Sequence, residues 1–303
     1  MSSEKTMTEN LSCRKPIAIG GLGGSGTRIV VEILKSIGFY IGCDLNRAND
    51  NLWFTLLLKR PKFFNFDLNN NKNEIFNCLN IFEKAMTANL SPNIFEFLYI
   101  LKIAIGMSYT GNSYRGEGKK IWPFKRVQTL MSSKKVNFSS YLGWGWKEPN
   151  THIFLEYLAE FFKDLKYIHV IRHGLDIAFS SNQSQLHHWG HLFGVNVNSS
   201  GCLPGLMLKF WIQSNLKTIS LARRILKENF IVLNYDKLCL NPEKEIIKLI
   251  EFLQLSENNI NIDQLTKIPK ITNSIGRYKT NDISIFSNKE LEEVENFGFE
   301  VDF

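Results

Sequence analysis

Two short segments of the chain contain the residue types that bind phosphate. The first, residues 20–28, reads GGLGGSGTR and has five glycines within seven positions. It follows the apolar residues 16–19 and precedes the apolar residues 29–35, which predicts a strand, a turn and then a helix. At such a turn backbone N–H groups and a helix N-terminus converge, and glycine lets the main chain approach an anion closely. This segment is therefore predicted to bind phosphate.

The glycine-rich segment partly matches two known nucleotide fingerprints. As a Walker loop it has Gly21, four residues and Gly26, but Thr27 and Arg28 stand where Lys and then Ser or Thr are expected. This argues against a nucleoside triphosphatase. The segment also fits G-x-G-x-x-G, and Asp44 lies 18 positions after Gly26, near the place of a ribose-binding acid. On this loop alone an NAD(P)- or FAD-dependent oxidoreductase stays open.

The second segment, residues 172–180, reads RHGLDIAFS and follows the predicted strand 166–171. Arg172 stands at the carboxyl end of that strand, where open α/β sheets bind ligands. Ser180 comes eight positions later, two turns into the helix that Gly174 begins. The guanidinium fork and the hydroxyl can thus reach one phosphate, a pair that dehydrogenase chemistry does not require. Together the two segments predict a nucleotide with two separate phosphates.

With these residues the chain resembles the sulfotransferase family, from about Pro16 to about Ser287. Members of this family transfer a sulfonyl group from 3′-phosphoadenosine 5′-phosphosulfate (PAPS). Similar landmarks are Trp211 in a long predicted helix, residues 230–238 followed by Asn241-Pro242, and the late segment 274–278. The resemblance implies that the cofactor contacts are Gly23, Gly24, Ser25, Gly26, Thr27 and Arg28 on the 5′ side, Arg172 and Ser180 at the 3′-phosphate, and Gly276, Arg277 and Tyr278 in the late segment.

The chain departs from this family at one cation. Most relatives have Lys or Arg immediately before the Ser-Gly-Thr of the loop, where this chain has Gly24. Lys147, at a predicted strand end 25 residues before Arg172, corresponds to the strand-end cation that reaches the transferring sulfonyl group in relatives. Arg28 is the second candidate for the missing charge. The resemblance implies no metal.

The general base has three candidates. Some relatives place a catalytic acid after the second strand, and the acids in that segment here are Asp44 and Asp50. His152 is the alternative. Each acid also has a structural interpretation, because Asp50 suits the N-cap of the helix that follows and Asp44 suits a turn.

The chemistry agrees with these residue types. Sulfonyl transfer is an in-line displacement that needs positioning, cations and a base. A sulfonyl group carries less negative charge than a phosphoryl group, so a Mg²⁺ clamp is dispensable. The expected product is 3′-phosphoadenosine 5′-phosphate, and the expected acceptor is a hydroxyl or amine of a carbohydrate, a lipid or a small molecule.

The polar stretch 182–204 is predicted to border the acceptor. No acid or cysteine accompanies its histidines at the spacing of a zinc site. A nucleotide-binding protein without transferase activity remains a further alternative, because of Gly24 and the open choice of base.

Composition sets wider bounds. Among 303 residues, 36 Lys and Arg exceed 29 Asp and Glu, which suits an anionic cofactor, and no basic stripe interleaved with aromatic residues indicates nucleic acid. The five cysteines are scattered, which favours a reducing compartment. No apolar run is long enough to span a bilayer. The expected location is therefore the cytoplasm.

The periodicity of apolar residues predicts alternating strands and helices. Strands are expected at 15–19, 38–41, 142–147, 166–171 and 230–235, and helices near 26–37, 50–60, 150–163, 174–183, 205–228 and 242–254. This order predicts a three-layer α/β fold, in which helices flank a central, mainly parallel sheet as in P-loop NTPases. Residues 73–133 are predicted to form a helical insert that caps the acceptor site. Residues 1–14 are expected to be disordered, and 15–303 to form one domain.

Overall fold

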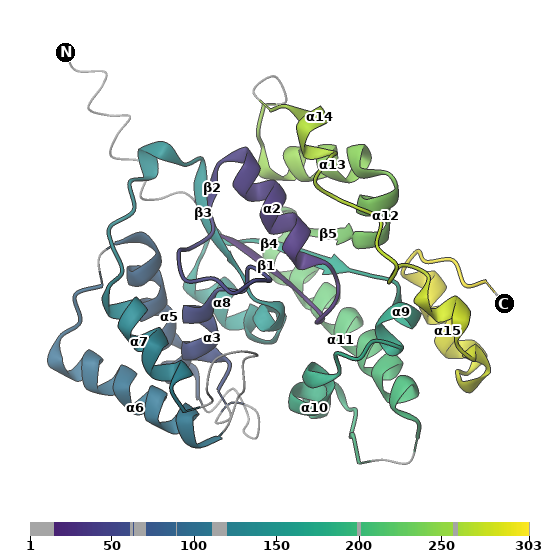
Figure 1. The fold of residues 1–303 in the computed structure, drawn as a ribbon, viewed down its shortest axis with the longest axis horizontal. Helices are drawn as coiled ribbons and strands as arrows, with labels where there is room; N and C mark the ends of the chain where they lie inside the picture. The colour runs from purple at the N-terminus through teal and green to yellow at the C-terminus, as the bar shows by residue number, and fades with distance from the viewer. Residues whose placement is uncertain are drawn as a thin grey trace. The chain divides into compact units, whose positions relative to one another are not determined.

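The computed structural model describes residues 15–60, 63, 71–88, 90–110, 120–198, 201–256 and 260–302. The expected disordered N-terminus, residues 1–14, lies outside these ranges. The chain divides into two compact units (Figure 1). Unit 1 comprises Met1–Pro16, Gly38–Glu148 and Tyr157–Asp164, and unit 2 comprises Ile17–Ile37, Pro149–Glu156 and Leu165–Phe303. The single domain with a capping insert stays a prediction.

Unit 2 is built on three parallel strands. These are β1 (Ile17–Gly21), β4 (Lys166–Ile171) and β5 (Phe230–Asn234), and β4 pairs with both of the others. Every residue of β1 and β4 is buried. Strands that are covered on both faces need such continuous apolar runs, because no side of the strand meets water.

Helices cover both faces of these strands. Lys166 donates from Nζ to the carbonyl oxygen of Phe252 (2.7 Å) in α13 (Pro242–Leu253), whereas the Nε2 of His169 lies 2.8 Å from Oδ1 of Asn215 in α11 (Leu203–Leu226). Side chains alternate along a strand, so residues three apart point to opposite faces. Helix α2 (Thr27–Ile37) also packs against β1. The predicted three-layer, parallel α/β fold is therefore confirmed.

Shorter elements complete unit 2. They are η3 (Pro149–Phe154), α9 (Gly174–Ala178), α10 (Ser184–Trp189), η4 (Gly190–Phe193), α12 (Tyr235–Leu240), α14 (Ile262–Leu265), η7 (Arg277–Thr280) and α15 (Asn288–Asn296). The predicted helix 174–183 ends early, because the side-chain amide of Gln183 donates to the carbonyl oxygens of Ala178 and Ser180 and so takes the place of further helical bonds. The predicted helix 150–163 is divided into η3 and α8 (Leu155–Phe161).

Unit 1 contains two parallel strands and the predicted run of helices. Strand β2 (Phe39–Tyr40) pairs with β3 (Gly143–Lys147). The helices are α3 (Leu52–Leu58), α5 (Lys72–Thr87), α6 (Ile94–Thr110) and α7 (Trp122–Met131). In their core the indole of Trp146 packs against the rings of Phe54 and Phe82, with ring centroids 5.8 and 5.3 Å apart. The aromatic residues of β3 thus fix the helices to the strand.

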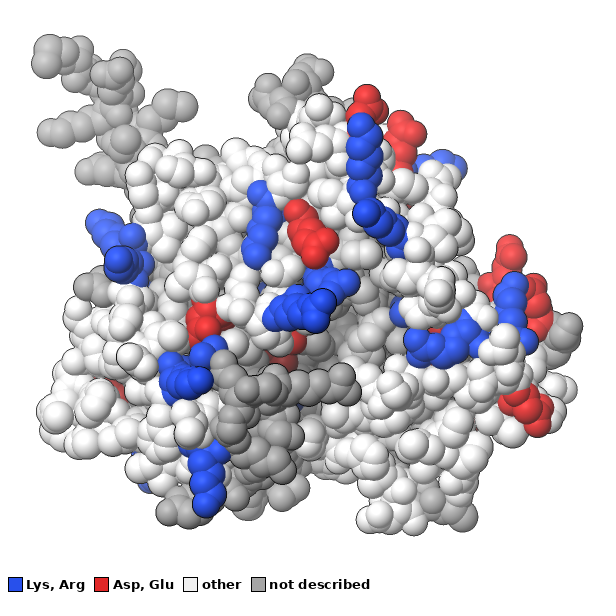
Figure 2. Space-filling view, viewed as in Figure 1, with Lys and Arg blue, Asp and Glu red and all other residues white. Residues whose placement is uncertain are grey.

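Basic side chains outnumber acidic ones, with 36 Lys and Arg against 29 Asp and Glu. Figure 2 shows Lys and Arg over many parts of one face and fewer Asp and Glu. Within the described ranges, no helix is both long and apolar enough to cross a membrane.

Candidate functional site

The glycine-rich loop has the predicted strand–turn–helix form. It follows β1, and α2 begins at Thr27. Gly24 and Gly26 have φ angles of 93° and 85°, in the region that glycine adopts without strain. A Cβ atom on Gly26 would also overlap the ring of Tyr235. The loop conformation therefore requires glycine at Gly26 for two separate reasons.

A buried hydrogen-bond network holds this loop in place. The amide of Gly23 donates to Oε1 of Gln185 in α10 (2.5 Å). The Nε2 of Gln185 and the indole Nε1 of Trp189 both donate to Oδ1 of Asn150, at 2.9 and 2.8 Å. Gln185 and Asn150 were not predicted as site residues, because their partners lie far away in the sequence. Trp189 is fully buried here, so its ring is part of the core.

Two buried polar atoms next to the loop have no hydrogen-bond partner within the described ranges. They are the hydroxyl Oγ of Ser25, whose residue is 1% exposed, and the Nε of Arg172. Buried polar groups are usually paired, and leaving one unpaired costs about 1–3 kcal/mol. The unpaired atoms belong to a loop and to a strand end that were both predicted to bind phosphate.

Arg172 joins three segments of unit 2. It donates from Nη1 to the carbonyl oxygen of Gly24 (3.3 Å) and from Nη2 to the carbonyl oxygen of Ser274. Its guanidinium carbon lies 4.9 Å from the centre of the Tyr235 ring. The structure therefore brings the glycine-rich loop, the second signature and the late segment together around one buried cation.

Asp176 positions the late segment. Its carboxylate is buried and accepts hydrogen bonds from the amides of Gly276 (2.9 Å) and Tyr278 (3.1 Å). Arg277 donates to the Asp176 carbonyl oxygen (3.3 Å), and the ring of Tyr278 stacks on His173 with centroids 4.4 Å apart. The predicted residues Gly276, Arg277 and Tyr278 thus dock on α9. Asp176 was missed, although an acid four positions after Arg172 was visible in the sequence.

Ser180 lies in the turn after α9. Its Oγ accepts a hydrogen bond from the amide of Asn182 (3.2 Å). The side chain of Asn182 borders the glycine-rich loop, since a Cβ atom on Gly23 would lie 2.8 Å from its Nδ2. The turn that contains Ser180 therefore lies beside the loop. Arg28 points to the surface, where its Nε is 3.7 Å from Glu32, and both side chains are about half exposed.

In unit 1 the buried Lys147 forms an ion pair with the partly exposed Asp50, whose side chain is 17% exposed. The ammonium of Lys147 contacts Oδ1 of Asp50 and donates to the carbonyl oxygen of Ala48 (3.1 Å). The second oxygen of Asp50 accepts from Nδ2 of Asn46 (2.8 Å). The N-cap of α3 is Asn51, whose side chain accepts from the amide of Phe54, so the interpretation of Asp50 as that cap is wrong.

Asp44 is part of a different network in unit 1. One carboxylate oxygen accepts from Nη1 of Arg126 (2.8 Å), and the other contacts the hydroxyl of Thr129. The indole of Trp53 donates to the same hydroxyl (3.1 Å). Both carboxylate oxygens are therefore bonded to residues of α7, which links the segment after β2 to the helices.

His152 is buried in unit 2 and has one bonded and one unbonded ring nitrogen. Its Nδ1 lies 2.9 Å from the carbonyl oxygen of Pro149, and a carbonyl can only accept, so Nδ1 carries the proton. Nε2 is then an unprotonated acceptor, and it has no partner in the part of the chain that the structure describes. Burial, aided by the nearby His169, lowers the pKa of His152 to about 3. The imidazole is therefore neutral near pH 7.

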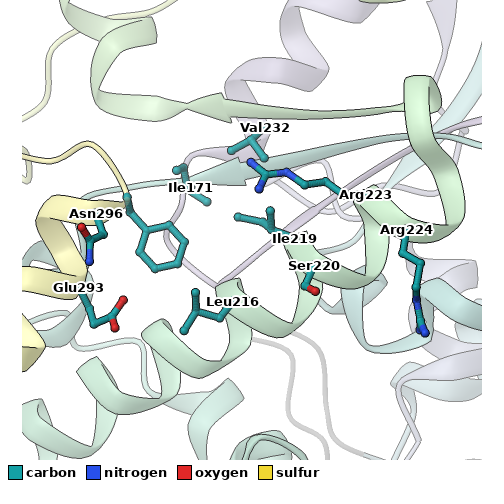
Figure 3. Close-up of a pocket in the computed structure, with 10 residues that line it drawn as sticks. Ile171, Leu216, Ile219, Ser220, Arg223, Arg224, Val232, Glu293 and Asn296 are labelled. Carbon is teal, nitrogen blue, oxygen red and sulfur yellow. The ribbon is translucent and has the colours of Figure 1, made fainter.

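A cavity of about 650 Å³ lies elsewhere in unit 2, among α11, the strands β4 and β5, and α15 (Figure 3). Its lining combines the apolar residues Ile171, Ile219 and Phe297 with the charged residues Arg223 and Glu293. Its lining includes none of the predicted site residues. Across the described ranges, no cluster of three His, Cys, Asp or Glu residues suits a metal ion.

Comparison with known proteins adds a family to this geometry. A sequence model of the sulfotransferase family matches residues 16–259. No curated protein gives a match. Several solved structures, including the following three, are similar to this chain. The sulfotransferase domain of the Synechococcus PCC 7002 olefin synthase has a TM-score of 0.48 and 13% identity, and the match covers 95% of this chain and 96% of that one.

The other two structures give similar values. For the sulfotransferase domain from the curacin biosynthetic pathway the TM-score is 0.45, the identity 14%, and the coverage 95% of this chain and 99% of that one. A sulfotransferase from Mycobacterium avium has a TM-score of 0.44 and 11% identity, and the match covers 99% of this chain and 81% of that one. The assignment rests on the family model, which spans most of the sequence and both segments that were predicted to bind phosphate. By that match, the chain belongs to the sulfotransferase family.

Proposed function

We propose that this transferase moves a sulfonyl group from PAPS to a hydroxyl or amine of a carbohydrate, lipid or small-molecule acceptor. The observation that carries the proposal is the position of Arg172, which contacts both the glycine-rich loop and the late segment. A nucleotide with a phosphate at each end of its ribose suits this arrangement, because the two segments predicted to bind phosphate meet in one unit.

The residues of unit 2 fit the two phosphates of this nucleotide. We assign the 5′ side to residues 23–28, where Ser25 has its unpaired hydroxyl and α2 presents its N-terminus. We assign the 3′-phosphate to Arg172 and Ser180, since the Nε of Arg172 still has a proton to donate. When bound, PAPS supplies the sulfonyl group and a stable bisphosphate leaving group.

Gly24 stands where most relatives have the Lys or Arg of the loop. Its φ of 93° would be strained for any residue with a Cβ atom, so this loop in its present form excludes Lys or Arg there. We propose that Lys147 supplies the charge instead, and stabilises the negative charge that develops on the leaving phosphate oxygen. Its low exposure, 3%, keeps water from screening that charge.

We propose Asp50 as the general base. It is bonded to Lys147, so a proton acceptor and the proposed cation lie next to each other in unit 1. In the reaction Asp50 takes the acceptor's proton as the new S–O or S–N bond forms and the S–O bond to the phosphate breaks. Asp44 is less suited, because Arg126 and Thr129 occupy both of its oxygens. His152 is the second candidate because its Nε2 is unprotonated, but burial lowers its pKa to about 3 and so makes it a weak base.

The polar stretch 182–204 remains our proposal for the acceptor side of the site. Trp189 is buried within it, whereas His191 and Asn196 are exposed, so hydrogen-bonding side chains rather than an indole face the solvent there. We also propose a cytoplasmic protein that does not bind nucleic acid. The four cysteines within the described ranges, Cys43, Cys78, Cys202 and Cys239, form no disulfide, which suits a reducing compartment.

Calorimetric titration of the purified protein with 3′-phosphoadenosine 5′-phosphate, ADP and NAD tests the cofactor. We expect clear preference for the 3′-phosphorylated nucleotide. Preference for NAD would contradict the proposal and favour an oxidoreductase. A second experiment follows the label from ³⁵S-PAPS into a panel of carbohydrate, lipid and phenolic acceptors. Tight nucleotide binding without transfer to any of them would favour a nucleotide-binding protein that lacks transferase activity.

A further inference from the structure

Most of the exposed side chains of α6 between residues 94 and 105 are apolar. Ile94, Leu98 and Ile105 are 63%, 52% and 42% exposed, and their spacing of four and seven residues places them on one side of the helix. Phe95, next to this stripe, is 80% exposed. A surface helix normally turns polar residues to water, so this continuous exposed stripe indicates a surface that another phase or molecule covers.

Helix α7, which packs against α6, also has exposed apolar side chains near its start. Ile121, just before its first residue, and Phe124 are 59% and 40% exposed. Exposed lysines stand beside the apolar side chains, with Lys102 on α6 and Lys120 and Lys125 at the start of α7. In the described part of the chain these three lysines have no ion-pair partner, so their charges are available to a ligand.

The net charge of the whole protein comes from this part of the sequence. Residues 97–146 contain eight Lys and Arg and a single acid, Glu117. Their net excess of seven basic residues equals that of the whole chain, which has 36 basic and 29 acidic residues. The one acid within α6, Glu96, is neutralised by Lys84 at 2.8 Å. Figure 2 shows mainly uncharged and basic side chains over α6 and α7. Among the described residues, the exposed apolar side chains of α6 and α7 are thus accompanied by Lys102, Lys120 and Lys125, whereas Arg126 is buried and paired with Asp44.

We propose that the exposed apolar side chains and lysines of α6 and α7, here called the α6–α7 surface, bind an anionic lipid membrane. Apolar side chains enter the boundary between headgroups and acyl chains, and lysines beside them attract the lipid phosphates. An acidic protein partner would not require the long apolar stripe. A second copy of this chain would bring two positive surfaces together. A lipid layer satisfies both features, and binding at its surface needs no spanning helix.

Vesicle flotation with the full chain and no nucleotide tests this inference. We expect the protein to float with vesicles of phosphatidylcholine and phosphatidylglycerol, and to bind poorly to phosphatidylcholine alone. Binding should weaken at high salt, which screens the lysines. Phe95→Glu and Leu98→Glu should each reduce binding about tenfold or more, because each removes a large apolar side chain from the lipid. Lys102→Glu with Lys125→Glu should abolish the preference for the anionic vesicles.

Matched controls lie outside this surface. Leu240→Glu changes a leucine that is 61% exposed in unit 2, and Lys244→Glu changes an exposed lysine of α13. Neither should alter flotation. Circular dichroism and melting of every variant verify that the fold is kept. The proposal would be overturned if the wild type bound neither kind of vesicle, or if the control variants lost as much vesicle binding as the variants of the surface. It would also be overturned if the wild type were an oligomer that did not bind vesicles and that Phe95→Glu converted to monomers. The last result would assign the surface to contact between copies of the chain.

Discussion

Gly26 shows how one residue determines the shape of the phosphate loop. Its positive φ and its contact with the Tyr235 ring both exclude a side chain. Gly194 has a similar φ of 73° but open space around its Cβ position, so it separates the two effects. We predict that Gly194→Ala costs about 1 kcal/mol of unfolding free energy through backbone strain alone. Gly26→Ala should cost more by about 1–3 kcal/mol and abolish binding of the nucleotide.

Urea unfolding of the two alanine variants measures this difference. Nucleotide titration of the same proteins shows whether the loop or only the overall stability has changed. Equal destabilisation by the two substitutions, with nucleotide binding retained in Gly26→Ala, would show that the loop tolerates a side chain and that its close packing on Tyr235 is unimportant.

The buried histidines predict a dependence of stability on pH. Burial lowers the pKa of His152 to about 3 and that of His169 to about 4, against about 6.5 for a free imidazole. Below about pH 6.5 the unfolded chain therefore binds more protons than the folded one, and the unfolding free energy should fall as the pH decreases from 7 to 5. His152→Gln should flatten this dependence, whereas replacing the exposed His191 should leave it unchanged. Urea unfolding at the two pH values measures it. A rise in stability on acidification would contradict the assignment.

Asp50 and Asp44 should respond differently to the same substitution. Asp50→Asn removes the proposed base, so turnover should fall about a hundredfold or more with nucleotide affinity little changed. Asp44→Asn weakens the buried bond with Arg126, so stability should fall by about 1–3 kcal/mol. Steady-state kinetics and urea unfolding of both variants separate the roles. If His152→Gln lowers turnover and Asp50→Asn does not, the histidine is the base.

At the scale of elements, Asp176 couples α9 to the late segment. It accepts from two backbone amides of that segment. An asparagine has only one acceptor oxygen in place of two, so Asp176→Asn should loosen residues 274–278 and lower nucleotide affinity several-fold. Hydrogen exchange should rise in that segment, while the exposed Asp263→Asn serves as control. Unchanged exchange at residues 276 and 278 would show that other contacts hold the segment.

The secondary structure was largely predictable because apolar runs with strand and helix spacing were clear. The strands β1 to β5 lie within two residues of the expected ranges. Other elements were missed for physical reasons. α10 and α12 have six residues each, less than two turns of helix, so their periodicity is too brief to detect. The start of α15 does have a sequence signal, the capping box of Ser287 and Glu290.

Within the candidate site, residue types were easier to predict than partners. The glycines, Arg172 and the late segment follow motifs, and the structure brings them together. Gln185 stabilises the loop from 162 positions away, and no local pattern indicates that pairing. The ion pair of Lys147 with Asp50 likewise connects residues 97 positions apart. Contacts of this kind depend on the tertiary fold, so a single sequence does not show them.

At the scale of the whole molecule, the chain divides into unit 2, which contains the segments predicted to bind phosphate, and the helical unit 1, whose sequence contains the excess of positive charge. Unit 2 contains every residue assigned to the nucleotide phosphates, whereas unit 1 contains Lys147, Asp50 and the α6–α7 surface. The exposed apolar stripe was not predicted from composition, because apolar content alone does not distinguish a core helix from one that faces outward. Charge counted by segment, rather than over the chain, was the available signal.

The most direct test of the account is recognition of the 3′-phosphate. Calorimetry compares 3′-phosphoadenosine 5′-phosphate with adenosine 5′-phosphate, which differs only in lacking that phosphate, in the wild type, Arg172→Lys, Ser180→Ala and the control Arg224→Ala. Losing the guanidinium fork should reduce the preference for the bisphosphate about 10- to 100-fold, and losing the hydroxyl should reduce it less. Both variants should keep the wild-type affinity for adenosine 5′-phosphate, and the control Arg224→Ala should bind both nucleotides as the wild type does. If Arg172→Lys weakens both nucleotides equally, or the wild type shows no preference, the central claim is contradicted.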